Sequence, residues 1–304
     1  MKKNVLLTGG TGFVGKYLTQ FLIDQGFSVS ILSRSKRTNT EDVFYYTWDV
    51  QKQTIEKEAV LQADYVIHLA GANIAEKKWT KARKEEILSS RELSAQLIHS
   101  VLKKYDKKLD AFISASAIGI YGAFNGEEVC TEETEAANDF LGLTCQKWEA
   151  SADRIGELGI RTVKVRTGLV LGKNDGFLNK LTPIFKLKLG SALGSGKQYM
   201  PWISVNDLCR IYLEAVKNPQ MQGAYNAAID DNTTNASFSK TLAKVYGYKI
   251  WLPHVPAFLI KMVLGEMALL VLTGRRVSSD KIKQLGFHFR NENLEETVRV
   301  CLDK

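Results

Sequence analysis

The chain has 304 residues, of which 45% are hydrophobic and 24% are charged, and this composition excludes a largely disordered protein. Its formal net charge of +8 arises from 41 basic and 33 acidic residues that are mixed along the chain. Because no long basic run and no nucleic-acid-binding motif is present, we expect no nucleic-acid partner and interpret the charge as a surface that attracts small anions.

The cysteines and apolar segments indicate a reduced, cytoplasmic protein without a membrane span. The four cysteines form no C-x-x-C pair, which argues against a disulfide framework and a zinc site; they are Cys130, Cys145, Cys209 and Cys301. The apolar run at the N-terminus is too short for a signal peptide. The segment 255–274 carries Lys261 and Glu266, which favours a packed or interfacial helix over a spanning one.

The first two-thirds of the chain alternate between strand and helix patterns. Helical stretches of about a dozen residues separate most of the strand candidates, so we predict an α/β fold with a doubly wound parallel sheet and helices on both faces. The predicted strands are 4–8, 27–32, 44–48, 65–70, 111–116 and 161–171.

The pattern changes after residue 172, where glycine-rich loops, two short strands near 200–204 and 224–228, and helices from 236 onward follow. We therefore predict a first domain over 1–172 and a smaller lobe over 173–304. The chain is expected to re-enter the first domain near 200–206 and 223–229, and the lobe to end in a helical segment at about 253–304.

A glycine turn joins the first predicted strand to the first predicted helix. Glycines at this place let backbone N–H groups and the helix N-terminus approach a pyrophosphate, which is typical of dinucleotide binding. The glycines also suit a tight turn without a ligand, but the strand and helix on either side favour the binding site. The residues expected to contact the cofactor here are Gly9, Thr11, Gly12, Phe13, Val14 and Gly15.

The second predicted strand ends in a basic segment. An NAD site usually presents an acid near this point for the ribose 2′-hydroxyl, but Ser33 is followed by Arg34, Lys36 and Arg37, with no acid between residues 24 and 41. Charged hydrogen bonds to a 2′-phosphate contribute about 1.5–3 kcal/mol each. We therefore expect NADP(H) as the cofactor, with Ser33 and Arg34 at its 2′-phosphate; a solvated basic loop is the alternative.

Several motifs resemble those of extended short-chain dehydrogenases/reductases: GGTGFVG at the glycine turn, HLAG (68–71), SASAIGIYG (114–122) and PWISVNDL (201–208). HLAGANI (68–74), the W-x10-SR spacing (79–91) and VPAFLIKMVLGEMALLVLTGRRV resemble the atypical, NAD-dependent epimerase-like branch called the epimerase family. The resemblance implies an NADP(H)-binding Rossmann domain and a substrate lobe with a short characteristic C-terminal domain. It implies no particular small-molecule substrate.

The resemblance also implies cofactor contacts farther along the chain. Residues Leu69, Ala70 and Gly71 match a strand end that passes beside the adenosine part of the cofactor, and Asp49 matches an adenine-contacting position. His68 lies inside a predicted strand, and we interpret it as a core histidine.

The acid–base residues usual in this superfamily are missing. The family places a Ser or Thr after the fifth strand, followed by a Tyr and by a Lys four residues later, but none of the eleven tyrosines here has Lys at i+4. Alignment of the following helix puts Leu141 and Cys145 at the Tyr and Lys positions. The substitutes are Ser116 and Tyr121, with Cys145 less favoured; structural roles for all three stay open.

Two basic residues fall on the apolar stripe of the helix predicted over 79–102. Arg91 should meet a carboxylate, backbone carbonyls or a cofactor phosphate, and Lys84 can extend to solvent. The strand 161–171 ends at the sheet edge where ligands bind, so we expect Thr167, Gly168 and Val170 beside the nicotinamide. The stretch GSALGSGKQ (190–198) lacks the residues of a P-loop and is interpreted as a substrate-lobe loop.

Two hypotheses about function follow. The first is an NADP(H)-dependent oxidoreductase or epimerase-like enzyme for a small molecule, with catalytic Ser116 and Tyr121. The second is an NADP(H)-binding redox-responsive regulator or scaffold with little or no catalysis, which the missing Tyr and Lys favour. The sequence leaves open whether the chain forms a homodimer.

Overall fold

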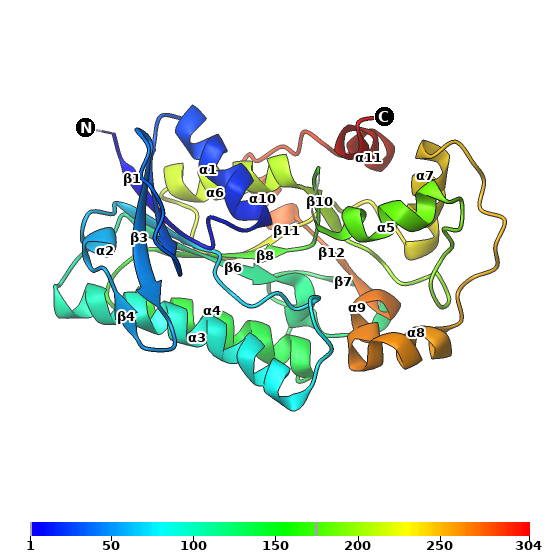
Figure 1. The fold of residues 1–304 in the computed structure, drawn as a ribbon, viewed down its shortest axis with the longest axis horizontal. Helices are drawn as coiled ribbons and strands as arrows, with labels where there is room; N and C mark the ends of the chain where they lie inside the picture. Colours follow the sequence, from blue (N-terminus) through cyan, green and yellow to red (C-terminus); the bar gives the residue numbers. More distant parts are fainter. Residues whose placement is uncertain (1, 174–175) are drawn as a thin grey trace.

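A large, mostly parallel sheet organises the N-terminal part of the chain in the computed structural model, which describes residues 2–173 and 176–304 (Figure 1). Its strand order is β11-β8-β6-β5-β1-β2-β3-β4, and only the β3–β4 pair is antiparallel. The strands are β1 (Asn4–Thr8), β2 (Ser28–Ser33), β3 (Val43–Asp49), β4 (Thr54–Ile55), β5 (Tyr65–His68), β6 (Ala111–Ala117), β8 (Thr162–Thr167) and β11 (Gly223–Ala227).

Helices cover both faces of this sheet, as expected for parallel strands that are joined by helical crossovers. Figure 1 shows α3 and α4 on one face and α1, α6 and α10 on the other. The predicted doubly wound α/β fold is therefore confirmed. The bounds are α1 (Phe13–Asp24), α2 (Glu58–Leu61), α3 (Lys81–Lys104), α4 (Phe140–Gly156), α6 (Val205–Lys217) and α10 (Asp280–Gln284), with a 3-10 turn, η1 (Ile118–Tyr121), after β6.

The later elements gather at one end of the sheet, together with two small parallel sheets, β9–β10 and β7–β12. Strand β11 joins the large sheet, as the re-entry near 223–229 predicts, whereas the strand near 200–206 pairs with β9 instead. These elements are β7 (Asn125–Cys130), β9 (Leu169–Leu171), α5 (Gly176–Lys186), β10 (Trp202–Ser204), α7 (Asn235–Val245), α8 (Ala257–Leu264), α9 (Leu269–Leu272), β12 (Gly274–Val277) and α11 (Leu294–Leu302).

The apolar segment 255–274 is divided rather than one helix. Helix α8 ends at Gly265, where φ is +58°, and a 3-10 turn, η2 (Gly265–Ala268), leads into α9. One side of the segment packs inward through Ile260, Met267 and Ala268, while Phe258 and Met262 are exposed. Among the residues that the structure describes, no helix has the length and apolarity needed to span a membrane.

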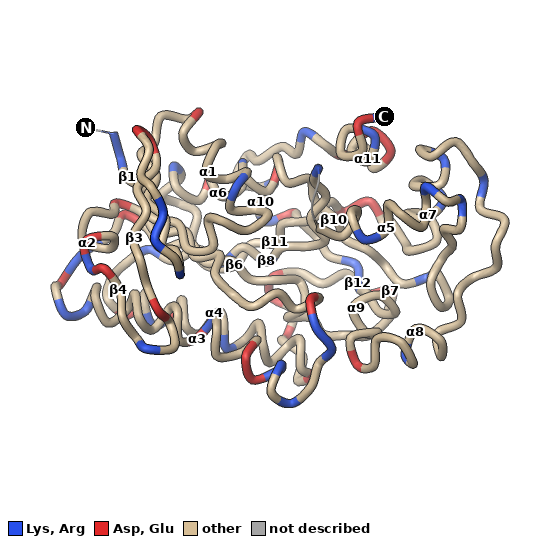
Figure 2. The backbone as a smooth tube through the Cα atoms, viewed as in Figure 1, with Lys and Arg blue, Asp and Glu red and all other residues tan. Residues whose placement is uncertain are grey.

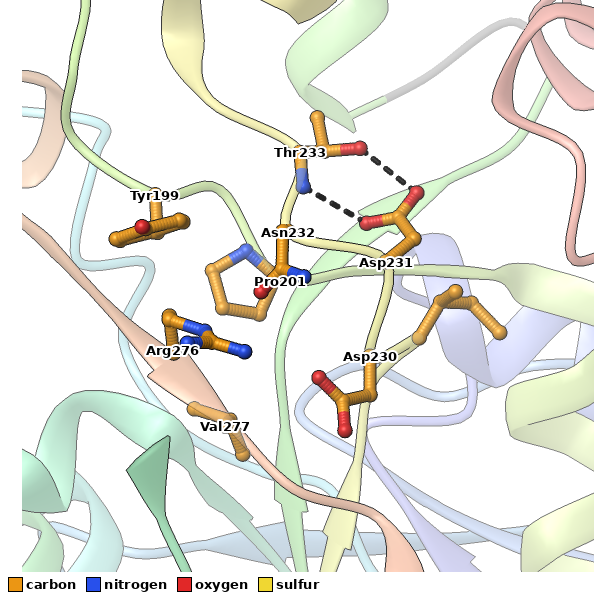
Figure 3. Close-up of a pocket in the computed structure, with 9 residues that line it drawn as sticks. Tyr199, Pro201, Asp230, Asp231, Asn232, Thr233, Arg276 and Val277 are labelled. Carbon is orange, nitrogen blue, oxygen red and sulfur yellow. Dashed lines mark hydrogen bonds between the residues drawn. The ribbon is translucent and has the colours of Figure 1, made fainter. Parts of the chain in front are cut away.

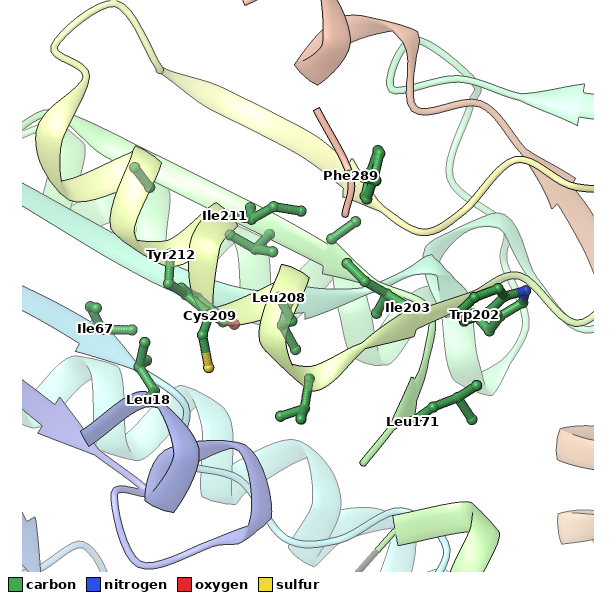
Figure 4. Packing of buried hydrophobic residues seen from close by; sticks show 14 of the residues in the cluster. Leu18, Ile67, Leu171, Trp202, Ile203, Leu208, Cys209, Ile211, Tyr212 and Phe289 are labelled. Atoms are coloured by element: carbon green, nitrogen blue, oxygen red, sulfur yellow. The ribbon is translucent and has the colours of Figure 1, made fainter. Parts of the chain in front are cut away.

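The main hydrophobic core fixes the central strands against α1 and α6. Figure 4 shows Leu18 of α1, Ile67 of β5 and Leu208, Ile211 and Tyr212 of α6 packed between these elements, all almost fully buried. Burial of each large apolar side chain contributes about 1.5–3 kcal/mol, so this packing holds α1 and α6 against the sheet. Lys, Arg, Asp and Glu are spread along the whole backbone (Figure 2).

Candidate functional site

The glycine turn between β1 and α1 is too tight for any other residue at its last glycine, Gly15. Gly9 has φ of +70°, and its carbonyl accepts a hydrogen bond from the Gly12 N–H at 3.0 Å. A Cβ added to Gly15 would lie 2.3 Å from Gly9 O and 2.6 Å from Gly10 Cα. The first turn of α1 therefore packs closely against the glycine loop. The backbone N–H groups at the N-terminus of α1 can then bind an anion, as they do for a dinucleotide pyrophosphate.

The carboxyl ends of the parallel strands meet along one edge. The register pairs Thr8 at the end of β1 with Leu32 on one side and His68 on the other, and pairs Ser116 of β6 with Arg166 of β8. The residues predicted to bind the cofactor at strand ends therefore share the edge with the glycine turn, which is where open α/β sheets bind ligands.

Arg34 and Asp49 follow the ends of two neighbouring strands. Arg34 is exposed directly after β2, while Ser33 before it is buried, with Oγ accepting a hydrogen bond from Ser35 N at 3.3 Å. The Asp49 carboxylate accepts from the backbone N–H groups of Gln51 and Lys52, both at 3.0 Å. Arg34 is thus available to a ligand, whereas Asp49 Oδ1 closes its own turn.

His68 is a core residue, in agreement with its interpretation from the sequence. It is fully buried, with Nδ1 2.8 Å from Thr8 Oγ1 and Nε2 3.1 Å from Ser94 Oγ. Burial lowers the pKa of His68 to about 4, so the ring is neutral at physiological pH. Thr8 Oγ1 also accepts from Ala70 N at 3.0 Å, which fixes the start of the predicted adenosine-binding segment, Leu69, Ala70 and Gly71.

Arg91 is buried beside this segment and makes no ion pair with a carboxylate in the described part of the chain. Its Nη1 donates to Ile87 O at 2.8 Å and to Ala72 O at 3.2 Å, and its Cζ lies 4.5 Å from the ring centre of Trp148. The Nε atom is buried without a partner, and burial lowers the pKa of Arg91 to about 10. A Cβ on Gly71 would lie 3.0 Å from Arg91 Cζ. An uncompensated cation here fits an anionic cofactor.

Lys84 does not extend freely to solvent, because it forms an ion pair with Glu266 at the start of the C-terminal segment. The buried cation in the first turn of α3 is the neighbouring Arg83. Its guanidinium donates hydrogen bonds to Glu86 at 2.7 Å, to Glu76 at 3.0 Å and to Asn73 O at 2.6 Å. The two carboxylates compensate the charge of Arg83, so this arginine holds the loop before α3 and is not free for a ligand.

The hydroxyls of Ser116 and Tyr121 belong to a buried polar network. Ser116 Oγ donates to Glu149 Oε1 at 2.7 Å, and Tyr121 donates to Asn226 Oδ1 at 2.7 Å. Arg166 links them: it binds Glu149 through Nε at 2.8 Å and Nη2 at 2.9 Å, and its Nη1 donates to Tyr121 Oη at 3.1 Å.

Burial shifts the pKa values inside this network. It raises the pKa of Tyr121 to about 12, so the phenol keeps its proton at neutral pH. Burial alone would lower the pKa of Arg166, but the hydrogen bonds and charge of Glu149 outweigh this effect and raise the pKa above its usual value. Arg166 therefore keeps its positive charge, and the hydroxyls of Ser116 and Tyr121 are both hydrogen-bonded within this network.

The two residues at the missing Tyr and Lys positions are both without a usable proton. Leu141 lies on α4 and lines a cavity, and Cys145 follows one turn later, almost fully buried. Burial raises the pKa of Cys145 to about 12, with the nearby Glu149 charge adding to the effect. The thiol is therefore inert near neutral pH, in line with its sequence interpretation as the least favoured substitute.

A cavity of about 680 Å³ opens between the strand ends and the C-terminal elements. Four residues predicted to contact the cofactor line it: Phe13, Thr167, Gly168 and Val170. The opposite wall comes from the segment 264–277, which the sequence interpretation did not assign to the site. Its apolar lining residues are Leu264, Met267, Leu269, Leu270, Val271 and Val277.

A second hollow lies at the loop 229–233 and shares Tyr199, Pro201 and Val277 with the large cavity (Figure 3). Its volume is about 10 Å³, room for roughly one water molecule. The Asp231 carboxylate there accepts from Thr233 N at 3.0 Å, from Thr233 Oγ1 at 2.7 Å and from Trp202 Nε1 at 2.8 Å. This hollow is too small for a substrate, so the large cavity is the candidate site.

The sequence interpretation also missed Glu149 as the partner of Arg166. The signal was present, since an arginine between Val165 and Thr167 in a buried strand needs a compensating partner, and a carboxylate is one candidate. Glu149 is one helical turn beyond Cys145, on the same face of α4, and its Oε1 accepts from both Ser116 and Arg166.

Comparisons with known proteins agree with this geometry. Residues 5–228 match the NAD dependent epimerase/dehydratase family, and residues 255–300 match a domain of unknown function, DUF1731. The chain is 36% identical to epimerase family protein YfhF of Bacillus subtilis, with 96% of this chain and 95% of that protein covered. It is 31% identical to the chloroplastic SDR39U1 homolog of Arabidopsis thaliana, with 98% and 86% covered.

Solved structures show the same fold. The human epimerase family protein SDR39U1 with NADPH superposes with a TM-score of 0.87 at 28% identity, with 99% of each chain covered. A UDP-glucose 4-epimerase from Thermotoga maritima, solved with UDP-glucose, superposes with a TM-score of 0.75 at 19% identity, with 99% of each chain covered. The family match covers most of the chain and includes the glycine turn. This chain therefore belongs to the NAD-dependent epimerase/dehydratase family.

Proposed function

We propose that the chain binds NADP(H) along the edge from the glycine turn to Thr167 and acts as an oxidoreductase or epimerase-like enzyme on a small molecule in the large cavity. The observation that carries the proposal is the cavity itself, because cofactor-side residues form one wall and the C-terminal segment forms the other. In this proposal, residues 1–172 bind the cofactor and 173–304 contribute the substrate lobe.

The cofactor would supply or accept the hydride, and the residues of this chain would hold and orient it. The glycine turn offers the N-terminus of α1 to the pyrophosphate, the exposed Arg34 offers a cation to a 2′-phosphate, and Arg91 offers a second cation, which is buried. NADPH bound by the human SDR39U1 protein supports the preference for NADP(H).

Proton transfer is the step of the proposed reaction that we expect to be slow. Positioned acid–base catalysis contributes roughly 10²–10⁴-fold to a rate, and Leu141 supplies no proton at the usual position. The catalytic role of Ser116 and Tyr121 stays a prediction; their bonds to Glu149 and Asn226 favour a positioning role instead. We therefore expect turnover that is slow for this superfamily.

The second candidate function is an NADP(H)-binding regulator or scaffold without efficient chemistry. Leu141 and the inert Cys145 favour it. The open cavity beside Thr167 and Gly168 argues for the enzyme, because a protein that only binds the cofactor has no need for such a space next to the predicted nicotinamide position.

Replacing Arg34 tests the proposal. Arg34→Ala should weaken NADPH binding by about tenfold or more, the loss expected for one charged hydrogen bond, while leaving NADH binding almost unchanged. The measurement is cofactor fluorescence on titration with each nucleotide. Arg154→Ala, an exposed arginine in the last turn of α4, is the matched control and should bind both like the wild type. Equal affinity of the wild-type protein for NADPH and NADH would refute the preference.

A further inference from the structure

We propose that the substrate of the large cavity is a predominantly apolar carbonyl or hydroxyl compound and not a nucleotide sugar. The inference rests on the proposed function, since it assigns the substrate class of the same site. Apolar side chains form most of the cavity wall on both sides: Phe13, Ile74, Leu141, Val170, Phe177, Met200, Leu264, Met267, Leu269 and Leu270 are among them. Such a wall favours apolar surface by about 25 cal/mol per Å² removed from water.

Two buried polar side chains in the wall are already occupied by the protein. Gln198 Nε2 donates to Leu193 O at 3.0 Å and to Val271 O at 2.7 Å. Asn235 Oδ1 accepts from Leu193 N at 2.7 Å, and its Nδ2 lies 3.4 Å from Met200 Sδ. These amides tie the loop before β10 to α7 and α9, so they are not free to bind substrate hydroxyls.

Three further polar side chains of the wall are also bonded to the protein. Tyr199 donates to Glu127 Oε2 at 2.6 Å, and Thr273 donates to Leu269 O at 2.6 Å. Lys180 Nζ donates to Ala75 O at 2.8 Å and so connects α5 to the loop after β5. These contacts build the cavity and use much of its polar lining. Arg275, which also lines the cavity, is paired with Glu128 through Nη2 at 3.1 Å, while its buried Nε has no partner among the described residues.

The magnitudes decide between the two substrate classes. Each hydroxyl or amide that is buried without a partner costs about 1–3 kcal/mol, and a nucleotide sugar carries many such groups. Each buried methylene contributes about 0.8 kcal/mol in the opposite direction. A ligand with one carbonyl or hydroxyl group near Thr167 and an apolar remainder against Met267 and Leu270 buries few unpartnered polar groups and much apolar surface.

A chain-length series tests this inference on the intact protein. With NADP⁺ bound, straight-chain 2-alkanones of four to ten carbons cannot be reduced, so calorimetry measures binding alone. Affinity should rise about fourfold per added methylene, the factor that corresponds to about 0.8 kcal/mol, until the cavity is filled. UDP-glucose should not bind at millimolar concentration. Equal affinities for all ketones of the series, or binding of UDP-glucose at millimolar concentration, would overturn the inference.

Two variants locate the effect. Leu270→Asn should weaken binding of the longest ketone that the wild type binds by about tenfold, because a polar group then faces the chain. Met262→Asn is the control, since Met262 is 71% exposed on α8 and outside the cavity. NADPH affinity is measured in every sample. If the wild-type protein does not bind NADPH, the proposed function is refuted. If it binds NADPH but its affinity for the ketones does not change with chain length, only the substrate class is refuted.

Discussion

Replacing Gly15 by alanine should nearly abolish NADPH binding. The added Cβ would lie 2.3 Å from Gly9 O and 2.6 Å from Gly10 Cα, and both contacts are with backbone that has no rotamer to change. The loop and the first turn of α1 must then separate, which moves the N–H groups away from the pyrophosphate. Loss of two charge-assisted hydrogen bonds costs about 3 kcal/mol, so we expect at least about 100-fold weaker binding by calorimetry.

The control for this variant is Gly126→Ala. Nothing lies within 4 Å of a Cβ built on Gly126, which is in the exposed strand β7. It should bind NADPH like the wild type. If Gly15→Ala folds and binds NADPH with unchanged affinity, the glycine turn is not the pyrophosphate site.

Replacing Glu149 by leucine should lower the free energy of unfolding by about 3–5 kcal/mol, the usual cost of leaving one partner of a buried ion pair alone. Arg166 would lose bonds of 2.8 and 2.9 Å, and Ser116 would lose its acceptor. Denaturant unfolding measures the change. The double variant Glu149→Leu/Arg166→Met should recover much of the loss, because the unpaired buried charge is then removed as well.

An exposed ion pair provides the contrast. Lys2 and Asp42 lie 3.3 Å apart at the surface, and such pairs contribute about 0–1 kcal/mol. Asp42→Asn should therefore change stability very little. A loss below about 1 kcal/mol for Glu149→Leu would show that water reaches Arg166, and the network would then be more open than its burial indicates.

The sequence predicted well those features that depend on local patterns. The first strand, 4–8, coincides with β1, and the glycine turn follows it as expected. Arg91 is buried on α3, as its place on the apolar stripe implied. In each case, neighbours within one or two turns of the chain determine the structure, so periodicity and turn chemistry are sufficient.

Features that depend on distant partners were not predictable in the same way. Residues 274–277 were predicted to lie in the helical segment of about 253–304, but they form strand β12, which pairs with β7 about 150 residues earlier. Strand β7 carries Glu127 and Glu128 and lacks an alternating apolar pattern, so its pairing is not visible locally. The apolar wall opposite Thr167 has the same origin, because the segment 264–277 reaches the sheet edge only in the folded chain.

A crystal structure with NADPH at saturating concentration tests the central claim most directly. We predict the pyrophosphate at the N-terminus of α1, the 2′-phosphate within hydrogen-bonding distance of Arg34, and the nicotinamide beside Thr167 and Gly168, facing the apolar cavity. A protein that stays free of nucleotide under these conditions, or a nicotinamide that lies outside the cavity, would contradict the proposed cofactor site and the chemistry assigned to it.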